Sequence, residues 1–282
     1  MSDSTSYGQS PQTQDKSETL KIMAVANQKG GVGKTTTAIN LATAMSAIGK
    51  KVLLVDMDPQ GNASTGLGVR RMQTDITIYD VLFDAQSLGS AARETRVPNL
   101  HLVSSTVHLA GAELELVNAP QREARLKQAI DHLDAYDFVI IDCPPSLNLL
   151  TLNALVAAHS VLVPLQCEFY ALEGLSQLTK TIERVRKRFN PDLEIEGVVL
   201  TMYDPRNNLS GMVADDVRQY FGDKVYKTVI PRNVRVSEAP SHGLPAIVYD
   251  MRCAGARAYI DLAKEMLRGK RSGGGPARQQ AA

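Results

Sequence analysis

The sequence predicts an α/β fold in which helices cover both faces of a mainly parallel, twisted sheet. Short apolar runs alternate along the chain with longer segments of helical periodicity, and this alternation is typical of such sheets. The chain has 282 residues, of which 44% are hydrophobic and 22% charged. That composition is typical of a globular protein with an aliphatic core, and it excludes a mainly disordered chain.

Six apolar runs are the expected strands, and six longer periodic segments are the expected helices. The strands are expected at residues 22–27, 51–56, 100–105, 138–142, 160–165 and 196–203. The helices are expected at about residues 34–48, 122–134, 148–158, 172–189, 211–221 and 254–268.

The composition along the chain predicts one folded domain between two tails. Residues 1–19 are rich in Ser, Thr and Gln and nearly lack large apolar groups, so we expect a flexible N-terminal arm. Residues 271–282 form a Gly-rich segment that we expect to be a flexible C-terminal tail. The single domain is therefore expected at residues 20–270.

Charge and cysteine content narrow the classes of protein. Lys and Arg total 31 and Asp and Glu total 30, for a formal charge of +1, so any nucleic-acid binding must come from a local basic patch. Cys143, Cys167 and Cys253 form no C-x-x-C pair, which favours a reducing compartment. With neither a signal-peptide pattern nor about 18 consecutive apolar residues, we expect a cytoplasmic protein that does not enter the membrane.

A glycine-rich loop follows the first expected strand and precedes a helix. In such a loop the backbone N–H groups turn toward phosphate oxygens, and the N-terminus of the helix adds partial positive charge. Lys34 is placed to reach the β- and γ-phosphates, and the Thr35 hydroxyl to ligate Mg²⁺. We therefore expect a P-loop NTPase domain whose nucleotide site includes Lys29, Gly30, Gly31, Val32, Gly33, Lys34, Thr35 and Thr36.

Three aspartates come at the ends of expected strands. Asp56 and Asp58 are two residues apart, so both can face the same side at the carboxyl edge of the sheet. Asp142 ends another buried strand, the position from which a Walker B carboxylate holds the water shell of a metal. Alone, each acid is more often a helix cap or turn former, but beside the glycine loop they predict a metal and catalytic site.

The loop departs from G-x-x-x-x-G-K-[ST] at its start, where Gln28 replaces the first glycine and Lys29 adds a second lysine. With this loop, the segments KGGVGKTT, VDMDPQGN, FVIIDCPPS, TMYDPRNN and PRNVRVSEAPSHG resemble the ParA/Soj partitioning ATPases over residues 20–268. The resemblance implies a deviant Walker A ATPase that binds ATP and Mg²⁺ and forms a nucleotide-sandwich homodimer, with Gly30 and Gly31 at the dimer face.

The resemblance also assigns roles to the site residues. Lys29 would reach the phosphates of the partner subunit, as an arginine finger does elsewhere. Asp58 would orient the attacking water, so the implied catalytic residues are Lys29, Lys34 and Asp58. The implied metal site comprises Thr35, Asp56 and Asp142, and the implied adenine contacts are Met202, Pro231 and Asn233.

The same resemblance implies the partners. Members without a preceding helix-turn-helix domain bind double-stranded DNA nonspecifically as ATP dimers, which makes the chain nucleoid-associated. Arg206 and Arg235 match family DNA-contact positions, with Lys187, Arg188 and Arg252 as further candidates. A ParB-like centromere-binding protein would stimulate hydrolysis and release the dimer from DNA, so the implied function is DNA segregation.

Other kinds of P-loop protein are alternatives to a partitioning ATPase. A MinD-like membrane-cycling ATPase would end in an amphipathic helix, whereas this chain ends in GGGPARQQAA. A nitrogenase-iron-protein-like reductase would need two well-placed cysteines, with Cys143 and Cys167 as the candidates. A related cargo-positioning ATPase, or a P-loop protein that signals by nucleotide occupancy alone, stays open; the intact Asp58 argues against the second.

Overall fold

The computed structural model describes residues 20–69, 75–83, 86–131 and 133–268. The arm expected at residues 1–19 and the tail expected at 271–282 lie outside the described residues. Within the described part, none of the helices is long and apolar enough to cross a membrane.

A seven-stranded sheet forms the centre of the fold, in the order β3-β4-β2-β5-β1-β6-β7. All neighbouring strands pair in parallel except β3 with β4, which confirms the predicted α/β class. The strands are β1 (Lys21–Val25), β2 (Val52–Asp56), β3 (Ala92–Glu94), β4 (Leu100–Val103), β5 (Phe138–Asp142), β6 (Ser160–Gln166) and β7 (Glu194–Thr201). The six expected strands are all present, and β3 was not expected.

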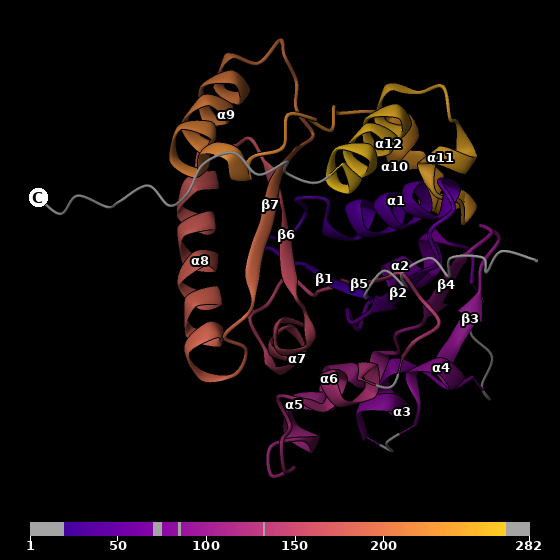
Figure 1. Ribbon diagram of the computed structural model, residues 1–282. Coiled ribbons are helices and arrows are strands. Elements are labelled where there is room, and N and C mark those ends of the chain that lie inside the picture. The colour runs from indigo at the N-terminus through magenta and orange to yellow at the C-terminus, as the bar shows by residue number, and fades with distance from the viewer. Residues whose placement is uncertain (1–19, 70–74, 84–85, 132, 269–282) are drawn as a thin grey trace, which may run out of the picture.

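Helices lie on both faces of this sheet (Figure 1). The longer ones are α1 (Lys34–Ala47), α7 (Leu149–Ala157), α8 (Ala171–Arg188), α9 (Asn208–Phe221) and α12 (Ala254–Leu267). The shorter α-helices are α2 (Asn62–Gly66), α3 (Ile78–Phe83), α4 (Leu88–Ala91), α5 (Ala112–Glu115), α6 (Arg125–Ile130), α10 (Val234–Glu238) and α11 (Ala246–Tyr249). In the described residues there are also three 3₁₀ helices: η1 (Val107–Gly111), η2 (Gly222–Lys224) and η3 (Ala239–His242).

The strands bury side chains on both faces, which gives two apolar cores. In β2, Leu53 and Val55 pack into one core, and Val52 and Leu54 pack into the other. The first core also takes apolar residues of α3, α6, α7, α8 and α9, and the second takes those of α1 and α12. This division agrees with Figure 1, where α1 and α12 lie on the side of the sheet away from α6 and α7.

The strand order brings the carboxyl ends of β1, β5 and β2 together. In register, Val25 of β1 pairs with Asp142 of β5, and Asp142 pairs with Asp56 of β2. Because parallel strands end at a common edge, the loop after β1 and the acids ending β5 and β2 meet there. That edge is where a ligand binds in open α/β sheets.

Candidate active site

The loop between β1 and α1 has the conformation that its glycines permit. Gly31 has φ of 74° and Gly33 has φ of 86°, in the left-handed region that side chains rarely adopt. Gly33 precedes the first turn of α1, which contains no acidic residue to offset the positive end of the helix. Thr201 at the end of β7 donates its hydroxyl to the Val32 carbonyl at 2.8 Å, which fixes the loop to the sheet.

The loop borders a cleft of about 700 Å³ at the carboxyl edge of the sheet. The opposite walls come from the turn after β2, which includes Asp58, and from the turn after β5, which includes Pro144 and Pro145. The loop itself contributes Gly30, Gly31, Gly33, Lys34, Thr35 and Thr36. Val32 is buried instead, so only its backbone is available to a ligand.

Lys34 points inward. Its side chain is buried, and Nζ donates to the Lys29 carbonyl at 2.9 Å. Burial lowers the pKa of Lys34, while the charges of Asp142 and Asp58 raise it. The lysine therefore stands as a desolvated cation beside carboxylates, where an added polyphosphate would find strong electrostatic attraction.

Lys29 has the opposite disposition, although it belongs to the same loop. Its ammonium pairs with the carboxylate of Glu168, which lies between β6 and α8, and its side chain is 41% exposed. Lys29 is absent from the lining of the cleft, whereas Lys34 is part of it. The two lysines of one loop thus point to different places: Lys34 lines the cleft, whereas Lys29 lies outside it.

Asp56 organises the turn that follows β2. One oxygen accepts from the Asp58 backbone N–H at 3.2 Å, and the other accepts from the backbone and hydroxyl of Ser64 at 3.1 and 3.2 Å. Burial raises the pKa of Asp56 to about 6, against the lowering effect of these hydrogen bonds. The expectation that both acids face the cleft is met by Asp58, which lines it, whereas Asp56 is fully buried behind it.

Asp142 is fully buried, and within the described residues neither of its oxygens has a partner of hydrogen-bond geometry. Burial, and then the charge of Asp56, raise its pKa well above the ordinary value, while the Thr35 side chain and Lys34 lower it. A buried carboxylate without a partner is costly, and a cation in the cleft would offset that cost.

The donor set at this edge fits Mg²⁺, which takes one or two carboxylates with substrate phosphates and water. Asp142 and the Thr35 hydroxyl have the capacity to serve it, while both oxygens of Asp56 are already engaged. No group of three or more His, Cys, Asp and Glu side chains in the described ranges is placed to hold a metal alone. Phosphate oxygens and water would therefore have to complete the shell.

The residues expected at the adenine lie along the extension of β7, outside the cleft lining. Met202 has φ of 49°, and its Cε would lie 3.9 Å from a Cβ placed on Gly33. Tyr203 pairs with Pro231 in a parallel bridge. Asn233 caps α10 through its side-chain oxygen, which accepts from the Val236 N–H at 3.3 Å, so its amide N–H₂ is the group left for a ligand.

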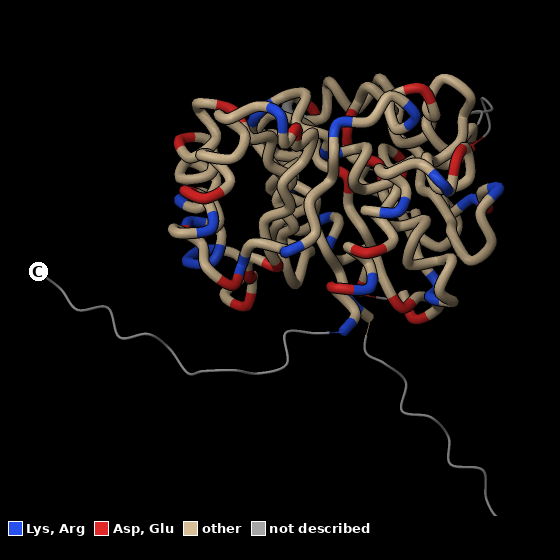
Figure 2. The backbone as a smooth tube through the Cα atoms, turned by 90° about the horizontal axis from the view of Figure 1, so that it is seen from above, with Lys and Arg blue, Asp and Glu red and all other residues tan. Residues whose placement is uncertain are grey.

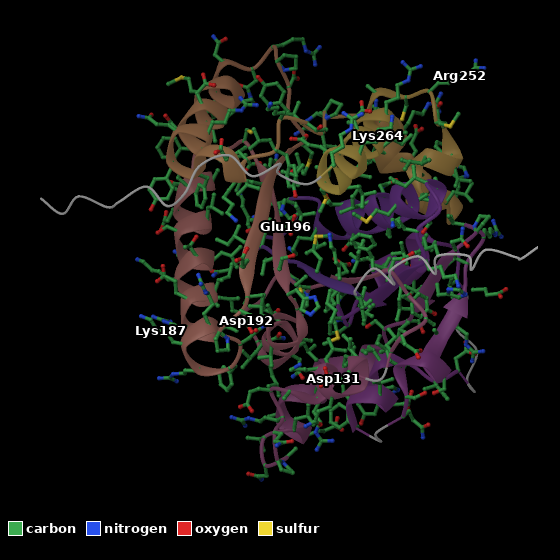
Figure 3. All side chains as sticks on the ribbon, viewed as in Figure 1. Asp131, Lys187, Asp192, Glu196, Arg252 and Lys264 are labelled. Atoms are coloured by element: carbon green, nitrogen blue, oxygen red, sulfur yellow. The ribbon has the colours of Figure 1, made fainter. Side chains whose placement is uncertain are left out.

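The expected DNA-contact arginines lie on two surface segments. Arg206 follows β7, with its side chain 88% exposed, and Arg235 lies on α10, with its side chain 55% exposed. Lys187 and Arg188 end α8, which runs back from the carboxyl edge of the sheet. Figure 3 shows Lys187 and Arg252 at opposite ends of the molecule, so the further candidates do not form one patch.

Reasoning from the sequence missed three residues of this site. Glu168 pairs with Lys29, Ser64 holds Asp56, and Thr201 holds the loop. Ser64 and Thr201 are common residue types in ordinary positions. Glu168 is 139 residues from Lys29, and no spacing in the sequence indicates that the two meet.

Comparisons with known proteins agree with the geometry. Residues 20–195 match the family model described as an AAA domain. The chromosome partitioning protein ParA of Caulobacter vibrioides (strain NA1000 / CB15N) is 59% identical over 251 residues, which cover 88% of this chain and 94% of that protein. The sporulation initiation inhibitor protein Soj of Bacillus subtilis (strain 168) is 58% identical over 247 residues, which cover 87% and 98%.

A solved structure shares the fold and contains a nucleotide. Cobyrinic acid a,c-diamide synthase from Mycobacterium smegmatis, with bound ADP and magnesium, superposes with a TM-score of 0.78 at 40% identity, covering 88% of this chain and 94% of that chain. The ParA and Soj relatives match over almost their whole length at more than half of the positions. The resemblance found in the motifs is confirmed: the chain belongs to the ParA/Soj family of chromosome-partitioning proteins.

Proposed function

We propose that this chain is a Mg²⁺-dependent ATPase of DNA segregation. Its ATP-bound homodimer binds double-stranded DNA nonspecifically, and hydrolysis stimulated by a ParB-like partner releases it. The observation that carries the proposal is the opposite disposition of the two loop lysines: Lys34 lines the cleft, while Lys29 is directed away from it. The cleft of a single copy therefore receives only one of the two lysine charges of its loop.

ATP binding rests on the loop and the cleft. The N–H groups from Gly30 to Thr36 and the ammonium of Lys34 hold the phosphates, at the uncompensated N-terminus of α1. Met202, Pro231 and Asn233 hold the adenine. The ATPase domain of this proposal spans residues 20–270.

Hydrolysis needs a positioned water and charge stabilisation more than covalent chemistry. Asp58 lines the cleft and orients water for in-line attack on the γ-phosphorus, as the bond to the β,γ-bridging oxygen breaks. Thr35 and Asp142 would hold Mg²⁺, which would neutralise charge on the phosphate oxygens. Asp56 keeps the Asp58 backbone in place, as its hydrogen bond to that N–H indicates.

Dimerisation completes each site with Lys29 of the second copy. On dimerisation the ammonium of Lys29 leaves the single carboxylate of Glu168 and contacts the triphosphate bound in the other copy. The triphosphate carries the higher charge, so this exchange is favourable when ATP is present. Gly30 and Gly31 are exposed, and a Cβ on either would meet no atom of the described residues within 4 Å, its two neighbours in the chain aside. Their small size therefore serves a contact outside the monomer, although Gly31 also needs its positive φ.

DNA binding and its regulation follow from the state of the dimer. Two copies bring two sets of surface arginines to one duplex, which increases affinity beyond that of one copy. A partner that favours the hydrolytic geometry would shift the dimer toward dissociation and so toward release from DNA. The relatives named for chromosome partitioning support this use of the cycle.

The proposal is tested by following DNA binding and turnover together. With ATP, the chain should bind two unrelated duplexes with nearly equal affinity, less tightly with ADP, and the affinity should fall steeply with salt. Adding the cognate ParB-like protein with DNA should raise the slow basal turnover. Equal DNA affinity with ATP and with ADP would contradict the proposal. Turnover that does not rise when the partner is added would favour a cargo-positioning ATPase with another adaptor.

A further inference from the structure

Three arginines lie on two segments that meet beyond the carboxyl end of β7. Arg206 lies in the turn after the strand, and Arg232 lies beside that turn, since its N–H donates to the Tyr203 carbonyl at 3.1 Å. The Tyr203 N–H in turn donates to the Ile230 carbonyl at 3.0 Å, so two backbone hydrogen bonds fix the segments side by side. Arg235 follows on α10.

The charge of Arg206 is offset by Asp204, which lies two residues before it. Asp204 accepts from Arg206 Nε at 3.0 Å and from Nη2 at 2.9 Å, which is a bidentate pair. The Arg206 backbone N–H donates to the same carboxylate at 3.0 Å. The hydrogen bond from the Arg206 side chain is the main reason why the pKa of Asp204 falls to about 2, so Asp204 is ionised at neutral pH.

Arg232 differs from both neighbours. Its side chain is exposed, and it makes no ion pair with any acid in the part of the chain that the structure describes. Its charge nevertheless acts on Asp204, whose pKa it lowers in addition to the effect of Arg206. Asp204 therefore lies in the field of two guanidinium groups and pairs with one of them.

Arg235 is the most heavily paired of the three. Its guanidinium lies 3.1 Å from Glu238 and 3.8 Å from Asp250. In the view of Figure 2, acids and bases are interspersed along the described residues. Because the chain has a formal charge of only +1, its affinity for a polyanion depends on which arginines are free of carboxylates.

We propose that Arg232 is a further DNA-phosphate contact of this chain, and that Asp204 limits its DNA affinity by holding Arg206 in an ion pair and by offsetting the nearby charge of Arg232. The inference rests on the proposed function, because it requires that Arg206 faces DNA. A phosphate that approaches Arg206 must replace Asp204, whereas Arg232 needs no exchange of partners. Arg232 can thus contact phosphate directly, whereas Arg206 must first break its ion pair with Asp204.

The expected effects follow from the electrostatics of exposed groups. Losing one phosphate contact reduces the log–log salt slope of binding by about 1, hence by about 2 for a dimer with two copies. Releasing an exposed arginine from its carboxylate is worth about two- to fivefold in affinity. Asn at position 204 keeps the side-chain oxygen that accepts from the Arg206 backbone, so D204N removes charge while the turn is retained.

The experiment measures DNA affinity by fluorescence anisotropy over a salt series, with the full chain and ATP. R232Q should weaken binding and reduce the salt slope by about 2, and D204N should tighten binding by about two- to fivefold. In an R206Q background the gain from D204N should shrink, because Arg232 alone is left to benefit. ATP affinity, measured in parallel, should be unchanged in every variant.

Matched controls lie at the other end of the molecule. Lys127 of α6 pairs with Asp131 at 3.1 Å, and both side chains are exposed. Figure 3 shows Asp131 at the end of the molecule opposite to Arg252. K127Q and D131N change the net charge by the same amounts as R232Q and D204N, so effects of equal size would show that only net charge matters and would overturn the proposal.

Two failures can be told apart. If the wild-type chain binds no DNA with ATP, or R206Q binds as tightly as wild type, the proposed DNA surface itself is wrong. If R206Q weakens binding while R232Q and D204N both match wild type, the DNA surface stands and this inference alone is rejected. Thermal unfolding of each variant identifies any that fail to fold; because D204N predicts a gain of affinity, a misfolded variant cannot imitate it.

Discussion

The cleft at the edge of the sheet and the arginine surface beyond β7 carry their charges in opposite ways. At the cleft, Lys34 is 7% exposed, and Asp56 and Asp142, which lie behind the lining, are 0% exposed. These charges therefore interact strongly, and Asp142 has no hydrogen-bond partner among the described residues. On the surface, the Arg206 side chain is 88% exposed and already paired. Buried charges of this kind require a ligand, whereas exposed pairs only adjust an affinity.

The largest effect is expected in the cleft, at its buried cation. Lys34→Ala removes the ammonium that faces the phosphates, so ATP-dependent dimerisation should be abolished, with ATP affinity reduced at least about 100-fold. Light scattering after gel filtration, with and without ATP, measures the dimer. Lys127→Ala, which removes an exposed cation of α6, is the control and should dimerise normally. A Lys34→Ala dimer of normal stability would remove this lysine from the site.

The next effect separates binding from turnover. Asp58→Ala leaves the loop and Lys34 intact but removes the group that orients water, so the ATP-bound dimer should persist while turnover falls at least about 100-fold. Phosphate release and dimer lifetime are measured on the same sample. Asp223→Ala in η2, an exposed aspartate away from the cleft, should turn over normally. Wild-type turnover in Asp58→Ala would show that its assignment is wrong.

A smaller effect concerns stability. Asp142→Asn removes a buried carboxylate, so the nucleotide-free chain should gain about 1–3 kcal/mol in the free energy of unfolding. Because the folded-state pKa of Asp142 is raised, wild type binds more protons when folded than when unfolded, and stability is lost as pH rises. The gain should therefore grow from pH 4 to pH 7, as measured by urea unfolding. The same variant should lose stabilisation by Mg²⁺ and ATP; a gain that does not depend on pH would contradict the electrostatic cause.

The smallest effect is expected on the arginine surface. Arg235→Glu should weaken DNA binding by about three- to tenfold and leave ATP binding unchanged, since its guanidinium already has two acidic neighbours. Anisotropy with a labelled duplex measures the first quantity and nucleotide titration the second. If affinity for DNA is unaffected, Arg235 does not belong to the surface.

The contrast between these regions also decides what the sequence alone could predict. The six expected strands and the loop were predictable because apolar runs and glycines act locally: β5 and α1 lie within one residue of their expected bounds. The strand β3 was missed because its three residues, Ala92–Glu94, are half-buried or exposed and have no apolar pattern. The helix expected at 122–134 extends only over Arg125–Ile130, and Gln121 before it has φ of 50°.

Within the site, the limit is the distance between partners in the sequence. The positions of Lys34 and Thr35 followed from the motif, but the burial of Asp56 behind Asp58 depends on Ser64. The carboxylate that pairs with Lys29 belongs to Glu168, after β6. One of the two carboxylates near Arg235 belongs to Asp250, after α11. Such pairings depend on tertiary packing, which a single sequence does not display.

The central claim, that a second copy completes each site, is tested most directly by mixing two inactive variants. Lys29→Gln retains Asp58, and Asp58→Ala retains Lys29, so a mixed dimer contains one site with its own Asp58 and the partner's lysine. With DNA and ATP, each variant alone should be nearly inactive, and an equimolar mixture should recover about one quarter of wild-type turnover, as expected for random pairing with one complete site in each mixed dimer. A mixture no more active than the two variants separately would contradict the claim that Lys29 acts across the dimer.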